Sequence, residues 1–507
     1  VCPEDSNDSS RFMDLWYTFV DPYATEVDEM GTDEANKSVG VLRIKDGRKI
    51  IDAYEWKHDN DVHLLAQNDE LIIYELHVGD FHEKFKDLTT KIEHFKSLGI
   101  NAIILMPIRQ TVQYSWGYNP RYSFAIEHTF GTTYEFKEMI DNMHANGIRV
   151  LVDGVYNHAD VSSPLAQIDH DYWFHHEPKD IQNSWGPEWN YQHYDAKYNV
   201  WPARKYVGDC IRYLVQEFHI DGLRFSSARF IQNFEFLTLI TQDVKKLAGN
   251  KPFYCAAEYI PEDPIITVAK NGPMDGLWHE KFYTTIKDIL IMNDDNNRVS
   301  LDQLKLVIDG RLQGYSSIQN LVNYLSNHDH NRFCYDIFTH IKDEQTAINR
   351  LKLGLLLLTT STGNILLWMG DEYGEMKAKS IEQSKLDWTL IPTNDFNKNL
   401  FSLWSKMLHI RQKYMHIFKT LNLKFIHENS DQQLLVYDRY ENNEHILIII
   451  NFGSLVKNYT ISNIPSKGIW TDLLSEHNYH LMDESNQLTF DVIEEKQGFI
   501  LILNRQQ

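Results

Sequence analysis

Four short segments carry most of the side chains that could act together as acids, bases and hydrogen-bonding groups. They are residues 153–158 (Asp-Gly-Val-Tyr-Asn-His), 222–229 (Gly-Leu-Arg-Phe-Ser-Ser-Ala-Arg), 258 (Glu) and 327–329 (Asn-His-Asp). A carboxylate beside an arginine or a histidine has a shifted pKa, and general acid–base catalysis depends on such shifts. Any one of these pairs is more often structural than catalytic. Four of them in order predict a single site, provided that the fold brings them together.

The elements that would position these segments are eight short apolar runs between about residues 70 and 375. They are residues 71–76, 102–106, 149–155, 222–225, 253–257, 276–278, 321–325 and 365–369. Helical patterns separate the runs, and two of these patterns stop at Gly99 and Gly147. Eight alternating strands and helices predict an α/β fold, a (β/α)8 TIM barrel with its chemistry at the C-terminal ends of the strands. The four segments follow the third, fourth, fifth and seventh runs, which places all of them at that end.

The pattern also predicts how the chain is divided into domains. Residues 69–415 are assigned to the barrel, with a subdomain inserted at about 158–202, where polar and aromatic residues replace a short βα loop. Residues 416–507 contain period-two runs such as 434–437, 445–450 and 499–503, which predict a C-terminal antiparallel β-sandwich. Residues 1–68 contain strand-like pieces at 16–20 and 41–44. They predict a partial N-terminal β-sandwich-like segment that is cut at its start.

The composition is that of a folded globular protein and argues against two classes of partner. Of 507 residues, 43% are hydrophobic and 24% are charged, and the net charge is -22. This charge repels phosphate backbones, so nucleic acid is not expected as a partner. No run of 18 apolar residues occurs, so membrane insertion is not expected either.

The cysteines and the first residue bear on the compartment. Cys2, Cys210, Cys255 and Cys334 lie far apart, without a CxxC pair or histidines at zinc spacing. We expect buried free thiols rather than a zinc site or a disulfide framework. The chain starts at Val1 rather than at a methionine, which indicates that an upstream segment has been removed. The compartment stays open, with the cytoplasm slightly preferred to secretion.

In its four segments the sequence resembles glycoside hydrolase family 13, the α-amylase family. The resemblance covers roughly residues 70–505, and the segments match the family's four signature regions in order. Four further motifs look like the branching, trehalohydrolase and isoamylase-type members, which have a sandwich domain before the barrel. These motifs are residues 74–79 (Tyr-Glu-Leu-His-Val-Gly), 116–118 (Trp-Gly-Tyr), 369–374 (Met-Gly-Asp-Glu-Tyr-Gly) and 386–388 (Leu-Asp-Trp).

The resemblance implies a site that acts on or binds α-1,4- and α-1,6-linked glucans such as starch, glycogen and maltooligosaccharides. Glu258 matches the general acid/base, Asp329 the carboxylate that stabilises the transition state, and Arg224 the guanidinium that orients the nucleophile. The remaining matches are substrate-binding positions: Tyr118 as an aromatic platform, Asp153, His158 and His328 at the cleavage subsite, and Arg229 near the acceptor.

The resemblance implies no required cofactor, although many amylases bind calcium. Asn157 aligns with a calcium ligand of those members, but no partner carboxylate can be identified in the insertion. Asn157 is therefore the single candidate calcium ligand that the resemblance implies.

The chain departs from the family pattern at Ser226, where the resemblance implies an aspartate nucleophile. Retaining glycosidases use two carboxyl groups about 5 to 5.5 Å apart, one as nucleophile and one as acid/base. A serine hydroxyl is uncharged at neutral pH and needs its own base, and its ether would release a far poorer leaving group than a carboxylate. We expect the chain to be inactive or impaired by several orders of magnitude in rate.

Several interpretations of this departure compete. In the first, the chain is an α-glucan enzyme whose nucleophile was replaced by engineering; the presence of Arg224 and Glu258 supports it. In the second, it is a natural, catalytically silent homologue that binds glucan or a partner protein; Ser227 supports it, since the family usually has a small apolar residue there. A water in the volume vacated at Ser226 would instead give an inverting hydrolase. An unrelated barrel enzyme with a phosphate site is disfavoured, since residues 371–372 (Asp-Glu) would repel phosphate in the last loop.

Overall fold

A closed barrel of eight parallel strands forms the centre of the molecule. The computed structural model describes residues 19–28, 38–49, 54–111, 115–268, 272–292, 299–481 and 486–504. The barrel order is β10-β11-β12-β13-β14-β5-β6-β9. Its strands are β5 (Ile72–Leu76), β6 (Ala102–Leu105), β9 (Arg149–Val155), β10 (Gly222–Ser226), β11 (Tyr254–Ala257), β12 (Gly276–Trp278), β13 (Leu321–Tyr324) and β14 (Asn364–Trp368). The eight predicted runs are confirmed as these strands, within one residue at each end.

The strands are apolar throughout because both of their faces are buried. Ile73 lies in the core inside the barrel with Ile104 and Leu151, whereas its neighbours Ile72 and Tyr74 belong to the core between the strands and the helices. Alternate side chains of a strand point to opposite faces, so each run supplies both cores at once.

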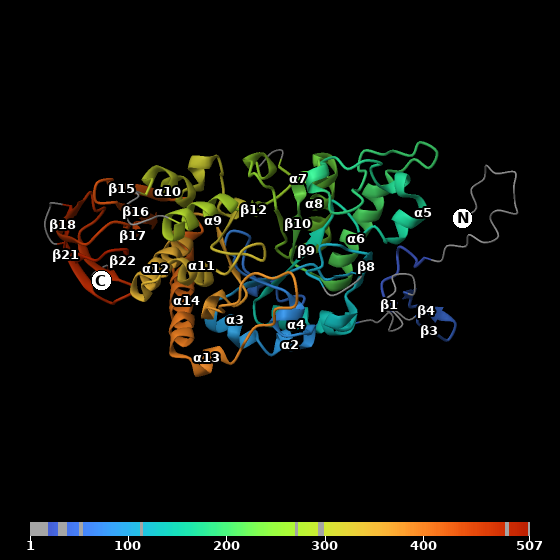
Figure 1. The fold of residues 1–507 in the computed structure, drawn as a ribbon, viewed down its shortest axis with the longest axis horizontal. Coiled ribbons are helices and arrows are strands. Elements are labelled where there is room, and N and C mark those ends of the chain that lie inside the picture. The colour runs from blue at the N-terminus through green and yellow to red at the C-terminus, as the bar shows by residue number, and fades with distance from the viewer. Residues whose placement is uncertain are drawn as a thin grey trace, which may run out of the picture.

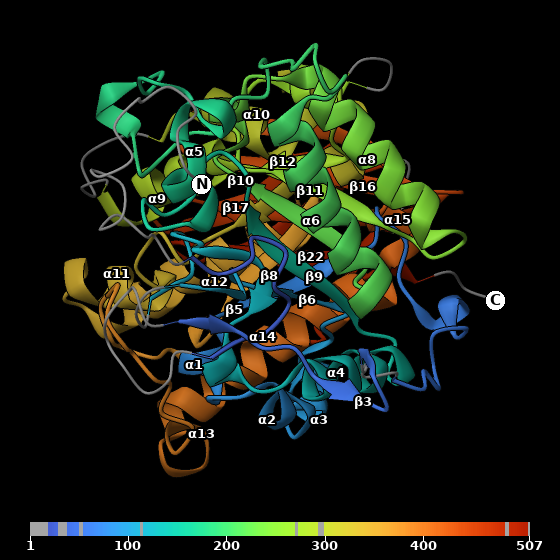
Figure 2. The same ribbon diagram turned by 90° about the vertical axis from the view of Figure 1, so that its right-hand side faces the viewer.

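Helices surround the barrel, as the end view in Figure 2 shows. The longer ones are α3 (Ile92–Leu98), α4 (Thr133–Ala145), α6 (Pro202–Phe218), α8 (Phe234–Ala248), α9 (Glu280–Lys287), α10 (Leu301–Ile308), α11 (Phe333–His340), α12 (Glu344–Thr360) and α14 (Asp395–Lys413), and the shorter ones are α1 (Val78–Phe81), α2 (Phe85–Thr89), α7 (Ala228–Ile231), α13 (Leu390–Thr393) and α15 (Met415–Phe418). The predicted stop at Gly99 is confirmed, since Gly99 follows α3 with a left-handed φ of 82°. A reciprocal pair of hydrogen bonds between Thr132 and Glu135 caps the start of α4.

One expected helix is missing from the described residues. The connection from β11 to β12 contains the 3₁₀ turn η5 (Pro264–Ile266) and no α-helix among residues 258–268 and 272–275. Pro261 and Pro264 both lie in this connection, and a proline has no N–H to donate within a helix. The prediction that every strand is followed by a helix is therefore wrong at β11.

The inserted segment contains more regular structure than its sequence predicts. It holds α5 (Pro164–Trp173), the 3₁₀ turn η4 (Ile181–Asn183) and three isolated antiparallel bridges, which join residues 158 and 188, 174 and 189, and 195 and 200. It projects beside α6, toward the end of the molecule opposite the C-terminal sheets (Figure 1).

The N-terminal strands differ from the predicted pieces. β1 (Val27–Asp28) pairs with β2 (Val39–Gly40), and β3 (Ile44–Lys45) pairs with β4 (Arg48–Lys49). Residues 16–18 of the first piece lie outside the described residues, and neither residues 19–20 nor residues 41–43 are in strands. A turn at Asp46 and Gly47, whose φ angles are 54° and 72°, connects the strands of the second pair. Residues with positive φ are typical of tight hairpin turns, and this turn, rather than an alternation of apolar residues, marks the hairpin in the sequence.

The C-terminal part is an antiparallel β-structure, drawn in red in Figure 1. Its strands are β15 (Leu423–Asn429), β16 (Leu434–Glu441), β17 (Glu444–Asn451), β18 (Val456–Ser462), β19 (Gly468–Asp472), β20 (Asn478–Leu481), β21 (Gln487–Ile493) and β22 (Gln497–Asn504). Six of them form one sheet in the order β15-β16-β17-β22-β19-β20, and β18 pairs with β21. Leu447 and Ile449 of the larger sheet share a core with Ile461 and Phe490 of the smaller one, so the two sheets pack face to face.

The sequence led us to expect buried free thiols and no membrane-spanning segment. Cys210, Cys255 and Cys334 are buried free thiols, as expected, and Cys2 lies outside the described residues. Among the helices of the described ranges, none combines the length and the apolar character needed to cross a bilayer.

Candidate active site

The barrel brings most of the predicted residues to one place. Asp153 lies on β9, Arg224 and Ser226 on β10, Glu258 directly after β11, and His328 and Asp329 after β13. The register of the parallel strands places Arg224 beside Asp153 of β9 on one side and Ala256 of β11 on the other. Tyr118 joins them from the loop between β7 (Arg109–Gln110) and β8 (Tyr122–Ile126).

Arg224 is the centre of the group and is fully buried. Its Nη1 donates to Asp153 Oδ2 at 2.5 Å and its Nη2 donates to Glu258 Oε2 at 2.9 Å, while the guanidinium lies 5.3 Å from the ring centre of Trp278. Burial alone would lower the pKa of Arg224, but the carboxylates of Asp153 and Glu258 outweigh it and raise the pKa well above its ordinary value. Arg224 is therefore a permanent positive charge at the base of the site.

Glu258 presents its two carboxylate oxygens differently. Oε2 accepts hydrogen bonds from Arg224, from the Ser227 backbone N–H at 2.8 Å and from Ser226 Oγ at 3.4 Å. Ser227 reaches it because its backbone is left-handed, with φ of 47°. Oε1 has no hydrogen-bonding partner among the described residues, and the side chain is 21% exposed. One oxygen is thus held in place and the other is available to a ligand.

Ser226 ends β10 between Arg224 and Glu258 and is buried. The Glu258 carboxylate, at 3.4 Å, is the group to which its hydroxyl donates. Oε2 already accepts two N–H groups, and its contact with this hydroxyl is long. The arrangement does not activate Ser226 as a nucleophile.

Tyr118, Asp153 and His328 form a hydrogen-bonded chain with a defined direction. The Tyr118 hydroxyl donates its one proton to Asp153 Oδ2 at 2.6 Å, so His328 Nε2, 2.8 Å from the same hydroxyl, must be the donor to Tyr118. His328 Nδ1 lies 2.9 Å from Glu75 Oε1 and donates to it. With both ring nitrogens as donors, His328 is an imidazolium.

The pKa shifts of His328 and Asp329 agree with this assignment of protons, whereas burial shifts the pKa of Asp153 toward its protonated form. Burial lowers the pKa of His328, but the carboxylates of Glu75 and Asp329 more than compensate and raise it above its usual value. Burial raises the pKa of Asp153 more than Arg224 and His328 lower it. Burial also raises the pKa of Asp329, but His328 and Arg224 bring it below the ordinary range, so Asp329 is an anion at neutral pH.

Gly117 is needed to bring Tyr118 into this chain. Its φ is 88°, and a Cβ at this position would lie 2.4 Å from the carbonyl oxygen of Pro107. The motif at residues 116–118 therefore depends on the absence of a side chain at its centre, which only glycine provides.

Asp329 is the most open of the carboxylates, with a side chain that is 46% exposed. Its Oδ2 lies 3.2 Å from His328 Nε2, and its carbonyl accepts a hydrogen bond from Lys379 Nζ at 2.6 Å. Lys379 comes from the loop after β14 and lies 5.5 Å from the ring centre of Trp116. This loop is thereby tied to the site.

Three predicted residues lie outside the hydrogen-bonded group. His158 Nε2 contacts the Tyr118 carbonyl at 2.8 Å, and burial lowers the pKa of His158 to about 4, so it is neutral and holds the Tyr118 loop. Arg229, on α7, donates to the carbonyl of Ile260 at 3.2 Å. Asn157 is buried beneath the insertion.

The surroundings of Asn157 do not fit calcium. Its Oδ1 is buried without a hydrogen-bonding partner, but calcium takes six to eight oxygen ligands, usually including carboxylates. The described part of the chain contains no group of three or more His, Cys, Asp or Glu side chains that could hold a metal ion.

Three residues of the site were missed in the sequence. Glu75 is buried at the end of β5 and holds His328 through the ring and, at 3.1 Å, through the His328 backbone N–H. Lys379 and Trp185 lie in loops; Trp185 is 47% exposed, and its ring centre is 5.3 Å from Phe230 and 6.0 Å from His158. Only Glu75 carried a signal, as a charge within an otherwise apolar strand.

Comparison with known proteins agrees with this geometry. The family model described as the alpha amylase catalytic domain matches residues 77–294. The malto-oligosyltrehalose trehalohydrolase of Saccharolobus solfataricus is 25% identical over 350 residues, which are 64% of this chain and 60% of that protein. Isoamylase 1 of Arabidopsis thaliana is 25% identical over 420 residues, with 64% of this chain and 53% of that protein covered.

A solved structure shares the fold over most of the chain. The α-amylase of Geobacillus thermoleovorans, complexed with acarbose, superposes with a TM-score of 0.73 at 21% identity and covers 87% of this chain and 100% of its own. The chain spans little more than half the length of the two curated relatives above. Residues 77–294 thus match the catalytic-domain model of the α-amylase family, and the chain has the barrel fold of an α-amylase.

Proposed function

We propose that this chain binds α-1,4- and α-1,6-linked glucans at the C-terminal end of the barrel, and that Ser226 strongly impairs the retaining double displacement there. The observation that carries the proposal is the linked group of Tyr118, Asp153, Arg224, Glu258 and His328 around a buried serine. These side chains are arranged for acid–base work on a glycosidic bond but lack the attacking carboxylate.

In this proposal Glu258 is the general acid/base. Its Oε2 is fixed by Arg224 and Ser227, so Oε1 carries the proton to the glycosidic oxygen of a bound glucan. Asp329 is the exposed anion that stabilises positive charge developing at the anomeric carbon. Asp153 Oδ1, which has no hydrogen-bonding partner among the described residues, accepts a hydrogen bond from a sugar hydroxyl, while the His328 imidazolium, whose two N–H groups are engaged, holds Tyr118 in place.

Ser226 leaves this machinery without its covalent step. Its hydroxyl carries no charge to stabilise an oxocarbenium-like transition state, and the nearby Glu258 oxygen is already engaged by two N–H donors. A glucan therefore binds beside the acid Glu258, but without an attacking carboxylate the glycosidic bond is not broken and no glycosyl-enzyme forms at a useful rate.

The test is a paired assay of the chain as written and of Ser226→Asp on amylose and glycogen, following reducing ends and iodine-binding chain length. We expect Ser226→Asp to gain about 10³-fold or more in rate, and the double variant with Glu258→Gln to lose that gain. A rise in reducing ends would indicate hydrolysis, and a changed iodine colour without it would indicate branching transfer.

Binding of maltoheptaose by both chains, measured by calorimetry, completes the design. If both chains bind glucan and both remain inert, the chain is a silent glucan-binding homologue and the impaired-enzyme proposal is wrong. If neither binds, the glucan assignment itself is wrong. A product with inverted anomeric configuration from the chain as written would replace the impaired double displacement by direct attack of water.

A further inference from the structure

The motif at residues 369–374 lies directly after β14, beside the site but outside its hydrogen-bonded group. Its two acidic residues, Asp371 and Glu372, begin the 3₁₀ turn η9 (Asp371–Tyr373) and are 2% and 0% exposed. Burying a carboxyl group is costly unless hydrogen bonds replace those to water. The partners of these two carboxyls therefore indicate what the motif holds in place.

The two oxygens of Asp371 bind residues on either side of Asp329. Oδ2 accepts a hydrogen bond from the hydroxyl of Ser326, and Oδ1 accepts one from the backbone N–H of Phe333 at 3.0 Å. Ser326 lies three residues before Asp329, and Phe333 lies four residues after it. One carboxyl thus joins the two ends of the segment 326–333, which carries Asp329 in its middle.

A second contact fastens the same segment to the motif. Arg332 Nε donates to the carbonyl of Met369 at 2.8 Å. Gly370 permits this contact, because its φ is 89° and a Cβ there would lie 2.8 Å from Arg332 Nε. The backbone of the motif therefore lies directly against the end of the segment 326–333.

A helix cap accounts for only one of the two hydrogen bonds of Asp371. Phe333 is the first residue of α11, and the cap residue Arg332 forms no side-chain cap hydrogen bond. A carboxylate that accepts an N–H of the first turn stabilises the start of a helix. The bond to Ser326 does not serve that helix, because Ser326 lies seven residues before Phe333. The two bonds together fix the distance between the ends of the segment.

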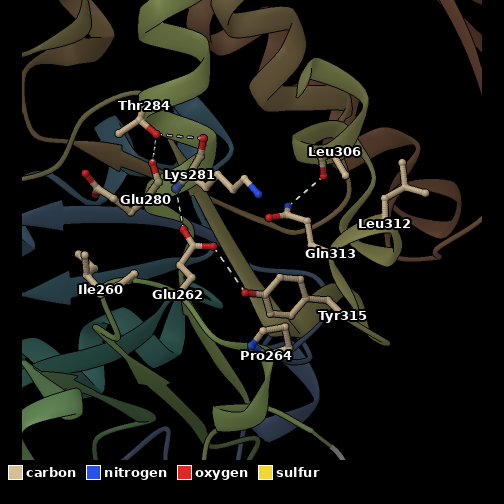
Figure 3. A pocket seen from close by; sticks show the side chains of 11 residues that line it. Ile260, Glu262, Pro264, Glu280, Lys281, Thr284, Leu306, Leu312, Gln313 and Tyr315 are labelled. Atoms are coloured by element: carbon tan, nitrogen blue, oxygen red, sulfur yellow. Dashed lines mark hydrogen bonds between the residues drawn. The ribbon is translucent and has the colours of Figure 1, made fainter. Parts of the chain in front are cut away.

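The helix α9 holds the segment at one further residue, His330. Its ring stacks on Tyr283 with 3.9 Å between the ring centres, and its Nε2 lies 3.3 Å from Glu280, which Figure 3 shows at the start of α9. These contacts act on the His330 ring. The side chain of Asp329 is 46% exposed, so its position depends largely on the backbone that carries it.

Glu372 faces away from the segment and provides a control within the same turn. Its Oε1 lies 2.9 Å from the Tyr74 hydroxyl and 2.9 Å from His94 Nε2, and its Oε2 accepts the backbone N–H of Gly370 at 2.9 Å. Tyr74 lies on β5 and His94 on α3. Loss of Glu372 therefore disturbs the packing of the barrel but not the bonds that join the ends of the segment 326–333.

We propose that Asp371 is a positioning residue, which joins the two ends of the segment 326–333 and thereby keeps Asp329 where it stabilises positive charge on a bound sugar. Asp371 acts through Asp329 and does not itself contact the sugar. The inference rests on the proposed function, because that function assigns the stabilising role to Asp329. A displaced Asp329 weakens the binding of a positively charged analogue more than that of a neutral sugar.

The test compares affinities for acarbose and maltotetraose by isothermal titration calorimetry in the full chain. The two ligands have the same length, but acarbose carries a basic nitrogen in place of one glycosidic oxygen. We expect Asp371→Ala to lose about tenfold in acarbose affinity and to change maltotetraose affinity by less than about twofold. Asp371→Asn keeps an acceptor for Phe333 and a donor for Ser326, so it should restore most of the loss. Glu372→Ala, the matched control, should leave the ratio of the two affinities unchanged.

Two further measurements show whether the effect passes through the segment. Ser326→Ala removes one of the two hydrogen bonds and keeps the carboxyl, and it replaces Asp371→Ala as the test if that variant does not fold. We expect it to lose acarbose affinity to an intermediate extent. Hydrogen exchange of residues 326–333, followed by mass spectrometry, should become faster in Asp371→Ala and Ser326→Ala but not in Glu372→Ala.

The outcomes separate this inference from the proposed function. If the unmodified chain binds both ligands and the variants at Asp371 and Ser326 keep its ratio of affinities, the inference is wrong and the proposed function stands. A loss of acarbose affinity without faster exchange in residues 326–333 would also overturn the inference, because Asp371 would then act by another route. If the unmodified chain binds neither ligand, both are wrong.

Discussion

Replacing Glu75 by glutamine tests whether a buried ion pair holds the imidazolium of His328. Glu75 Oε1 accepts from His328 Nδ1 at 2.9 Å and Oε2 accepts the His328 backbone N–H at 3.1 Å, and both side chains are at most 3% exposed. Glutamine keeps the shape and one acceptor but removes the charge. We expect the pKa of His328 to fall, because Glu75 is the strongest influence raising it.

The cost follows from the type of hydrogen bond that is lost. A hydrogen bond to a charged group contributes about 1.5 to 3 kcal/mol and a neutral one about 0.5 to 1.5 kcal/mol, so Glu75→Gln should destabilise the barrel by about 1 to 2 kcal/mol. Because the folded pKa of His328 is raised above its unfolded value, this stabilisation is complete below the unfolded value and is lost as the pH rises through the folded pKa. The destabilisation should therefore be larger at pH 6 than at pH 9.

Urea-induced unfolding, followed by tryptophan fluorescence at both pH values, measures this difference. Glu93→Gln, which neutralises an exposed glutamate of α3, is the matched control and should leave stability unchanged. The double variant with His328→Gln should lose little more than either single variant, since the two side chains act as a pair. A loss that is equal at pH 6 and pH 9 would refute the assignment of His328 as an imidazolium.

Four further variants test other parts of the site. Asp153→Asn should destabilise the chain by about 3 kcal/mol in urea unfolding, because it removes one carboxylate from the buried Arg224 charge; a loss below 1 kcal/mol would contradict that pairing. Gly117→Ala should weaken maltoheptaose binding in calorimetry, because a Cβ would collide with Pro107 and displace Tyr118; full affinity would contradict the role of this turn. Trp185→Ala should weaken glucan binding about twofold to tenfold, by analogy with other aromatic contacts, whereas Tyr440→Ala on β16 should not; equal effects would exclude Trp185 as a platform. His158→Gln should make the stability of the chain less sensitive to acid between pH 6.5 and pH 4. The pKa of His158 is depressed in the folded state, so its contribution to stability is present above this range and is lost as the pH falls through it. An unchanged pH profile of unfolding would contradict this role.

Much of the barrel could be predicted because its strands are buried on both faces and leave contiguous apolar runs. The site followed from the same argument, since parallel strands end at one edge of the barrel and carry Asp153, Arg224 and Glu258 there. Glu75 was not predicted as a site residue because a single charged residue inside an apolar run does not change the prediction of a strand. Lys379 and Trp185 lie in long loops, where no periodicity relates a residue to a position in space.

The errors have similar physical causes. The N-terminal strands are two residues long, so their residues show no alternation, and the turn at residues 46–47 was the available signal. The insertion is ordered by bridges between residues as distant as 158 and 188, which local patterns do not reveal. His158 stays a predicted sugar contact, and its observed contact with the Tyr118 carbonyl was not predicted because it depends on how two loops pack.

The contact between Glu75 and His328 has a consequence for biosynthesis. The two residues are 253 positions apart and lie at the ends of β5 and beyond β13, the two strands that β14 joins. During translation, Glu75 emerges long before its partner, and the ring stays open until β14 inserts between its neighbours. The site can therefore form only after β14 has been synthesised and has closed the ring.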